Sequence, residues 1–143
     1  MQVSDTSLPG VYEIEPRVFE DSRGFFLETY RTSRYDHNDM SVEFRQSNHT
    51  HSAHRTLRGL HYQMARPQGK LVYAARGEVL DVAVDIRRGS PHLVNGMPSY
   101  SMIQITSNYS FRLTSPMGFA CSRRLRTSTT SAPTSISPTM KAD

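Results

Sequence analysis

The segment that decides the fold runs from Gly69 to Ile86 and reads GKLVYAARGEVLDVAVDI. It predicts two β-strands on either side of the compact turn signal Arg76-Gly77. In the second strand, successive side chains point to opposite faces, with Val82, Val84 and Ile86 on one face and Asp81, Ala83 and Asp85 on the other. A period of two is typical of a β-sheet and not of an amphipathic helix.

Short strand-like segments separated by turn residues also occupy the chain before this pair of strands. Val11–Glu15 alternates between apolar and polar residues, and the turn Asp21–Gly24 leads into the β-prone segment Phe25–Tyr30. One short helix is predicted over Thr32–Met40. Many short strands between Gly, Pro and Asp turns favour a barrel or a sandwich, so the predicted fold is all-β, an antiparallel jelly roll.

The composition fits one folded domain without a disulfide. The chain has 143 residues, of which 36% are hydrophobic and 9% aromatic, and this is enough for a single core. A lone cysteine, Cys121, excludes an intrachain disulfide and a thiolate metal cluster built from one chain. Without an apolar run of about 18 residues and with acidic residues near its start, the chain is expected to be soluble and cytoplasmic.

The net charge of +4 comes from the second half of the chain. Residues 1–90 hold 12 basic and 12 acidic residues, whereas residues 91–143 hold five basic residues against Asp143 alone. The arginines at 123, 124 and 126 have no aromatic residues between them, so a nucleic-acid partner is not expected. No membrane partner is expected either.

The last part of the chain has a composition unlike that of the rest. Between Ser122 and Thr139, ten of eighteen positions are Ser or Thr, which leaves too little apolar surface to offset the entropy of ordering. We therefore predict a folded domain over residues 1–120 and a Ser/Thr/Arg-rich disordered tail over residues 121–143.

Histidines are concentrated between positions 49 and 61. His49 and His51 have the i, i+2 spacing that turns two side chains to one face of a strand, and together with His54 they leave a metal site of the cupin type open. Such a site needs a third ligand, often a carboxylate, and no carboxylate lies between His51 and His61. The other interpretation is a polar loop or a solvated strand.

Leu57–Gln63 sets a charge and a histidine between leucines on a strand pattern. Strict alternation puts Arg58 and Leu60 on one face, and Leu57, Gly59 and His61 on the other. Glycine beside His61 leaves room for a ligand to approach the backbone. On these residues alone, His61 is either a hydrogen-bonded core histidine or a functional one.

Four segments resemble signature blocks of the dTDP-4-dehydrorhamnose 3,5-epimerase family, in the family's order. They are 16–28 (PRVFEDSRGFFLE), 57–63 (LRGLHYQ), 67–72 (PQGKLV) and 76–87 (RGEVLDVAVDIR). The resemblance covers roughly residues 8–91. It implies a cupin-like jelly roll, usually a homodimer, that needs neither metal nor cofactor. The implied activity is that of an isomerase which converts dTDP-4-dehydro-6-deoxyglucose to dTDP-4-dehydrorhamnose in dTDP-rhamnose or related deoxysugar biosynthesis.

The resemblance also implies roles for eight residues. His61 is the base that removes the C3 and C5 protons next to the C4 ketone, and Lys70 donates to the developing enolate. Arg23, Gln46, Asn48 and Arg58 hold the nucleotide and its pyrophosphate, Glu28 contacts the thymine-nucleoside end, and Asp81 is a polar position inside the barrel. Without the resemblance, Arg23 could be a turn residue, Lys70 an edge-strand charge and Asp81 a solvated strand residue.

The second half of the chain departs from the family pattern. Epimerases of this family use a tyrosine acid on the opposite face of the sugar and an aspartate that orients the catalytic histidine, and neither has a matching position here. Pro116–Ala120 resembles a family block in which histidine follows Phe-Ala, but residue 121 is Cys. We hypothesise a change of reading frame near residue 91 and expect little epimerase activity. The alternative function is a non-catalytic or metal-binding cupin module.

Overall fold

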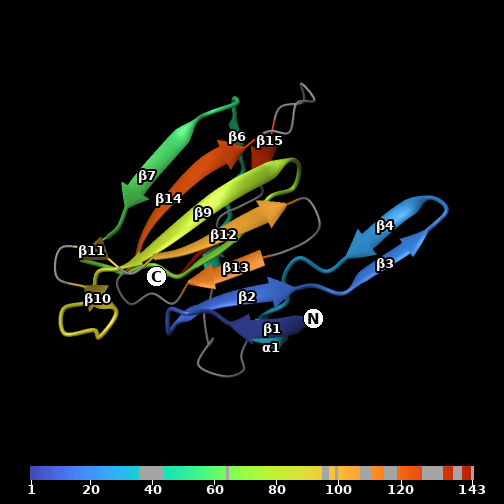
Figure 1. Cartoon of the computed structure of the whole chain (residues 1–143). Coiled ribbons are helices and arrows are strands. Elements are labelled where there is room, and N and C mark those ends of the chain that lie inside the picture. Colours follow the sequence, from blue (N-terminus) through green and yellow to red (C-terminus); the bar gives the residue numbers. More distant parts are fainter. Residues whose placement is uncertain are drawn as a thin grey trace.

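The protein is built almost entirely from antiparallel β-strands (Figure 1). The computed structural model describes residues 1–35, 44–63, 65–94, 97–98, 100–106, 111–114, 119–126, 134–136 and 140–142, with side chains as far as Leu93. A six-stranded sheet and a four-stranded sheet face each other. This architecture confirms the predicted antiparallel jelly roll of the cupin-like kind.

The six-stranded sheet joins strands from both ends of the chain. Its order is β1 (Gln2–Asp5), β2 (Val11–Glu15), β13 (Phe111–Thr114), β8 (Lys70–Tyr73), β16 (Met140–Ala142) and β5 (Phe44–Gln46). The four-stranded sheet has the order β12 (Tyr100–Thr106), β9 (Glu78–Asp85), β14 (Phe119–Arg126) and β7 (Leu57–His61).

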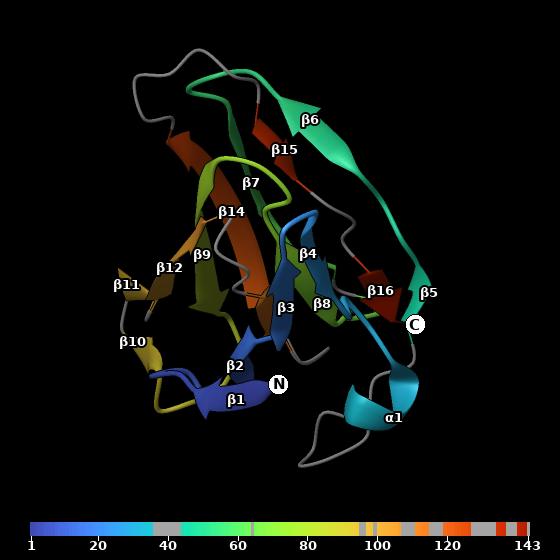
Figure 2. The same ribbon diagram turned by 90° about the vertical axis from the view of Figure 1, so that its right-hand side faces the viewer.

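Three pairs of strands lie outside these two sheets. They are β6 (Thr50–Ser52) with β15 (Thr134–Ile136), β10 (Leu93–Val94) with β11 (Met97–Pro98), and β3 (Val18–Asp21) with β4 (Gly24–Leu27). Figure 2 shows β6 and β5 following one another along one side of the molecule.

The interior between the two sheets follows from the alternation in β9. Val79 packs with Val72 of β8 and with Ala74 directly after that strand, and Ala83 packs with Leu8 and Val11. The face of β9 that carries the acidic residues is therefore the inner one, and its side chains are almost fully buried. The predicted alternation is confirmed.

The opposite face of the six-stranded sheet is covered by the first helix. Ile14 and Leu71 form a buried cluster with Tyr35 of α1 (Thr32–Tyr35), and partly buried aromatic residues surround it. The described helix is one turn long, and positions 36–40 of the helix predicted over Thr32–Met40 lie outside the described residues.

Three described strands, β14 to β16, fall wholly or mostly in the segment for which the composition predicts a disordered tail. Each is paired with a strand from the first ninety residues: β14 with β7 and β9, β15 with β6, and β16 with β5 and β8. The domain boundary at residue 120 stays a prediction. No helix in the described part of the chain is long and apolar enough to cross a membrane.

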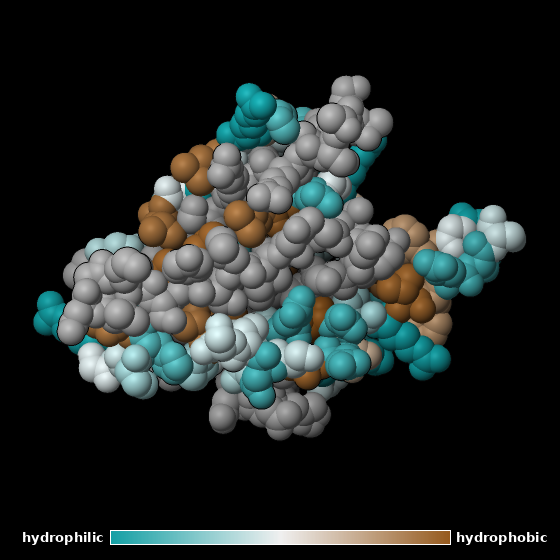
Figure 3. All heavy atoms as spheres, viewed as in Figure 1, coloured by the Kyte–Doolittle hydropathy of each residue, from teal (hydrophilic) through white to brown (hydrophobic). Residues whose placement is uncertain are grey.

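The β3–β4 hairpin extends away from the two sheets (Figure 1). Phe19, Phe25 and Phe26 are exposed on it, with 50%, 58% and 69% of their surface accessible. The Arg17 guanidinium lies 4.7 Å from the centre of the Phe19 ring. In Figure 3 apolar surface gathers over this hairpin and, on the other side of the molecule, over β7.

Candidate functional site

Lys70 lies on the inner face of the six-stranded sheet. It is the first residue of β8 and, by the alternation of a strand, shares a face with Val72, which packs against Val79 of the facing sheet. Across the sheet, Lys70 is in register with Thr114 of β13, which is in register with Val11. Val11 also belongs to the inner cluster, so the register and the packing agree.

His61 and Arg58 lie on the inner face of the four-stranded sheet. His61 is in register with Cys121 of β14, which pairs with Ala83, and Arg58 is in register with Arg123, which pairs with Asp81. Paired positions of an antiparallel sheet share a face. Since Asp81 and Ala83 are both on the inner face of β9, His61 and Arg58 share that face.

The expectation that Arg58 and His61 point to opposite faces is therefore wrong. From the pair His61–Cys121 to the pair Arg58–Arg123, the chain covers two residues on β14 but three on β7. This extra residue is a β-bulge. Gly59 lies inside the bulge with a φ of 113°, a backbone angle that favours glycine. The extra residue restores both side chains to one face.

The two predicted catalytic residues face the same interior. Ala83 and Val11 pack together and join the two sheets. From this contact, His61 lies two strands along one sheet and Lys70 two strands along the other. His61 is exposed and Lys70 half-buried, so this end of the interior is open to solvent.

Asp81 is buried in the middle of this inner face, with 1% of its surface accessible. It lies between Val79 and Ala83 along β9 and in register with Ile103 and Arg123 on the neighbouring strands. Its position is inside the barrel, as the family resemblance implies, and it is not a solvated strand residue. A buried carboxyl needs polar partners, and Asp81 does take part in a polar or electrostatic interaction in the structure.

Gln46 and Asn48 lie at the edge of the same interior. Gln46 is in register with Lys141 of β16, and Lys141 is in register with Lys70, so the three positions form one row on the inner face. The Gln46 Nε2 donates a hydrogen bond of 2.8 Å to Asn48 Oδ1. This bond orients both amides.

The guanidinium of Arg58 is held by a residue that the sequence pattern did not reveal. Arg58 Nε donates a hydrogen bond of 3.0 Å to Oγ of Ser52, which is buried on β6. Ser52 and Arg58 are six residues apart and lie on different strands, so their contact leaves no periodic pattern in the sequence. The path of the chain from β6 to β7 brings the two side chains together.

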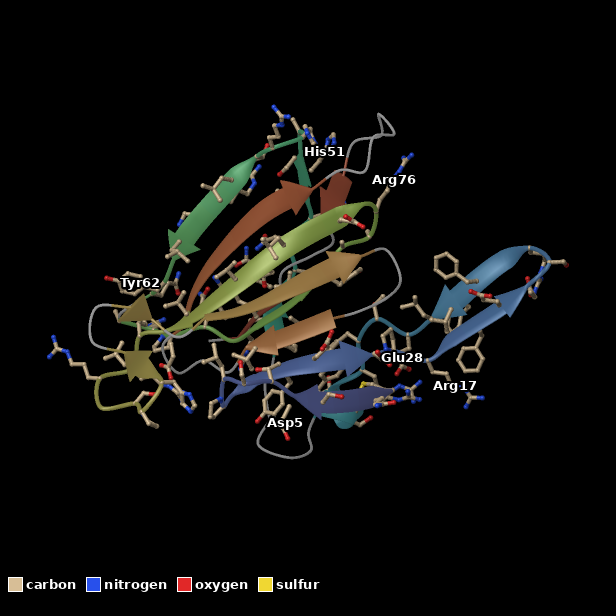
Figure 4. The ribbon with its side chains drawn as sticks, in the orientation of Figure 1. Asp5, Arg17, Glu28, His51, Tyr62 and Arg76 are labelled. Carbon is tan, nitrogen blue, oxygen red and sulfur yellow. The ribbon has the colours of Figure 1, made fainter. Side chains whose placement is uncertain are left out.

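The other two predicted binding residues lie at the hairpin end. Arg23 is at the tip between β3 and β4, has 88% of its side chain exposed, and pairs with Asp21 at 2.5 Å. Glu28 follows β4, and its carboxylate accepts from Arg31 at 2.6 Å and Arg34 at 3.0 Å. Figure 4 shows Glu28 on the hairpin side of the protein and Tyr62, the neighbour of His61, at the opposite side.

Glu28 lines a separate cavity of about 210 Å³ at the base of the hairpin. The cavity is mainly basic and aromatic, since Arg17, Arg31 and Arg34 meet Phe19 and Phe26 there. On its inner side, burial and the nearby Glu28 carboxylate raise the pKa of Tyr35 to about 12, so this phenol stays neutral. The two arginines bonded to Glu28 were not among the predicted site residues.

The histidines at 49, 51 and 54 do not assemble a metal site. Within the part of the chain whose side chains are described, no group of three or more His, Cys, Asp or Glu could hold a metal ion. His49 and His51 are exposed on and before β6, and Figure 4 shows His51 at the rim of the molecule.

The fold and this interior define a cupin-like jelly roll with histidine, lysine and arginine positions between its sheets. A family model described as dTDP-4-dehydrorhamnose 3,5-epimerase matches residues 5–129. The chain therefore belongs to the dTDP-4-dehydrorhamnose 3,5-epimerase family.

Individual relatives carry the same family name. The dTDP-4-dehydrorhamnose 3,5-epimerase of Neisseria gonorrhoeae is 43% identical over 120 residues, which are 84% of this chain and 35% of that protein. The protein of the same name from Pseudomonas aeruginosa is 52% identical over 92 residues, 64% of this chain and 51% of that protein. The chain thus spans between a third and a half of the length of these relatives.

Solved structures agree along nearly the whole chain. The dTDP-6-deoxy-D-glucose-3,5-epimerase of Legionella pneumophila in complex with dTDP-4-keto-L-rhamnose superposes with a TM-score of 0.84 and 34% identity. The superposition covers 99% of this chain and 71% of that one.

Proposed function

We propose that the protein is an isomerase that epimerises a dTDP-4-keto-6-deoxyhexose, turning dTDP-4-dehydro-6-deoxyglucose into dTDP-4-dehydrorhamnose for deoxysugar biosynthesis. The observation that carries the proposal is the placement of His61 and Lys70 on facing inner surfaces of the two sheets. The weakly acidic C–H bond next to a ketone breaks fast enough for catalysis only where a base reaches the proton and a donor stabilises the enolate oxygen.

In this reaction His61 removes the protons at C3 and C5, and a proton from solvent adds to the opposite face of each carbon, because these residues offer no match for the family's tyrosine acid. The electron pair of the broken C–H bond moves onto the C4 oxygen. The Lys70 ammonium donates to that oxygen, and a compact positive charge suits an enolate that forms and disappears within one turnover. The chemistry needs no redox partner because substrate and product are isomers.

The nucleotide end of the substrate is proposed to bind beside β5 and β7. Arg58 supplies paired donors to the pyrophosphate, and the amides of Gln46 and Asn48 supply neutral ones. Gln46 and Asn48 lie on or next to the inner row that contains Lys70, and Arg58 lies on the inner face of the facing sheet. A phosphate bound there places the sugar toward the centre of the sandwich.

We also propose a homodimer in which the hairpin of one subunit completes the site of the other. The hairpin that carries Arg23 at its tip, and Glu28 after it, lie on the opposite side of the protomer from Tyr62 (Figures 1 and 4), so one chain does not bring them to His61. The hairpin exposes three phenylalanines, and β7 exposes Leu57, Leu60 and the adjoining Tyr62. Two such apolar surfaces on one molecule are suited to pair reciprocally about a twofold axis.

Catalysis by these 143 residues is proposed to be slow, because they offer no match for the family's tyrosine acid or orienting aspartate. Loss of an orienting aspartate can lower the rate of a histidine base by several orders of magnitude. If a frame change near residue 91 is the origin, the other two frames of the coding DNA encode the missing Tyr and Asp blocks. Frames without these blocks would contradict that origin.

Incubation with dTDP-4-dehydro-6-deoxyglucose in deuterated water, followed by mass spectrometry, tests the function. We expect slow deuterium incorporation at C3, lowered at least about 100-fold further by His61→Asn, which removes the base but keeps a polar side chain at the position. The Pseudomonas aeruginosa relative serves as the reference. Exchange as fast as in that enzyme would contradict the proposed impairment, and absence of both exchange and dTDP binding would contradict the function.

A non-catalytic cupin module is the second candidate, and it rests on the missing matches for the family's tyrosine acid and orienting aspartate in these 143 residues. Binding of dTDP without any deuterium exchange above that of His61→Asn would favour this module.

A further inference from the structure

Ser52 stands out because it is a buried hydroxyl beside an exposed charged strand. It has 4% of its surface accessible, and it lies on β6, which pairs with β15 at Thr134. Its Oγ accepts the Nε–H of Arg58 at 3.0 Å. All residues of β7 are exposed. This hydrogen bond therefore restrains a guanidinium that is otherwise accessible to solvent at the open end of the interior.

We propose that Ser52 is a positioning residue that sets the direction in which Arg58 presents its guanidinium to the pyrophosphate of the substrate. The inference rests on the proposed function, because it needs a pyrophosphate bound at Arg58. It adds a residue to the site that acts only through Arg58 and does not itself touch the reacting atoms.

The geometry of a guanidinium gives the reason. The group is planar and presents its donors in a fixed fork, so fixing Nε also fixes the directions of Nη1 and Nη2. Among the residues that the structure describes, no hydrogen bond or ion pair engages either Nη group of Arg58. Nη1 and Nη2 can therefore each donate to one of two phosphate oxygens, which is the bidentate arrangement that arginine favours.

The bulge in β7 makes the anchor necessary. It turns Arg58 to the inner face together with His61, but an exposed edge strand does not restrict the four side-chain torsions of an arginine. Because the Ser52 hydroxyl is buried, water does not compete with Arg58 for its hydrogen bond. A side chain already held in its bound orientation loses less entropy when the ligand arrives, so binding tightens without a new contact.

A double-mutant cycle measures the effect. We expect Ser52→Ala to weaken dTDP binding about three- to tenfold by calorimetry, the range associated with ordering one long side chain. In an Arg58→Ala background, Ser52→Ala should cause no further loss, because the residue acts through the guanidinium. Ser52→Thr keeps the hydroxyl and should restore affinity, while the exposed Ser4→Ala is the matched control.

Nuclear magnetic resonance of the Arg58 Nε–H gives a readout that is independent of any ligand. Its order parameter should fall in Ser52→Ala and stay unchanged in Ser4→Ala. An equal loss of affinity with and without Arg58, or an unchanged Nε–H in Ser52→Ala, would overturn the role of Ser52. Failure of the unaltered chain to bind dTDP would instead overturn the proposed function together with this role, so the two failures are distinguishable.

Discussion

The interior near His61 and the β3–β4 hairpin differ in what surrounds their charged residues. In the interior, His61, Arg58 and Lys70 extend from three registered rows of two packed sheets. On the hairpin, Arg23 pairs with its neighbour Asp21, and the Arg23 side chain is largely in solvent. A site on sheets is positioned by the fold, whereas a residue on a projecting hairpin is positioned by whatever the hairpin contacts.

The same sequence spacing occurs in both regions with different surroundings. Asp21–Arg23 and Asp85–Arg87 are each an aspartate two residues before an arginine, and each aspartate accepts from the arginine backbone N–H, at 2.8 and 2.9 Å. The Asp85 side chain is fully buried, and it also accepts from Ser90 at 2.7 Å. The Asp21 side chain is half exposed. The two-residue spacing lets each aspartate bond its arginine, and the burial of the aspartate decides how much the ion pair contributes to the free energy of unfolding.

The largest effect expected from this comparison is the rescue of two inactive variants by mixing. His61→Asn and Arg23→Ala should each be nearly inactive in deuterium exchange. After subunit exchange, a heterodimer has one site with both residues intact, so activity should return to about a quarter of that of the unaltered chain. No recovery, with heterodimers shown by native mass spectrometry, would place Arg23 outside the site of the partner.

How far the sequence predicts the structure differs between these regions. The alternation of residues 78–86 predicted β9 and its two faces, because one strand contains the whole period-two signal. The faces of β7 were predicted wrongly, since the bulge is a property of its register with β14 and not of its own residues.

The candidate site shows the same division. The inner placement of Lys70 and Asp81 agrees with the family resemblance, whereas Ser52 carries no signal of its own in the sequence. The separation of Arg23 from His61 could not be read from spacing, because a hairpin of eight strand residues can fold against the sheets or away from them. Only the arrangement in space distinguishes these cases.

The next effect concerns stability. Asp85→Asn should lower the free energy of unfolding by about 2–4 kcal/mol, because it leaves the Arg87 guanidinium and the Ser90 hydroxyl with a poorer acceptor in a buried position. Arg87 also donates to the carbonyl of Pro9 at 3.2 Å, so the segment before β2 should loosen as well. Urea unfolding measures the loss, and an unchanged midpoint would contradict the structural role of the pair.

Lowering the pH should reduce stability through protonation of the same Asp85 carboxylate. Burial acts to raise the pKa of Asp85, but hydrogen bonds from Arg87 and Ser90 together outweigh it and lower the pKa from 3.8 to about 2. A lowered pKa in the folded state adds stability above the unfolded value, and this stability is lost as the pH falls from about 4 through 2. The contribution is about 2 kcal/mol. Unfolding measured between pH 5 and 2 should therefore be less pH-dependent in Asp85→Asn than in the unaltered chain.

The smallest effect is expected at the matching pair on the hairpin. The Arg23 guanidinium lowers the pKa of Asp21, but both side chains are in solvent, so Asp21→Asn should leave the free energy of unfolding within about 0.5 kcal/mol. In the proposed homodimer, Arg23 binds the nucleotide held in the site of the partner subunit. Removing its ion pair with Asp21 by Asp21→Asn should therefore change the affinity for dTDP without changing stability. A loss of stability as large as that of Asp85→Asn would show that the hairpin is packed against another surface in solution, and that the two regions differ less than they do in one protomer.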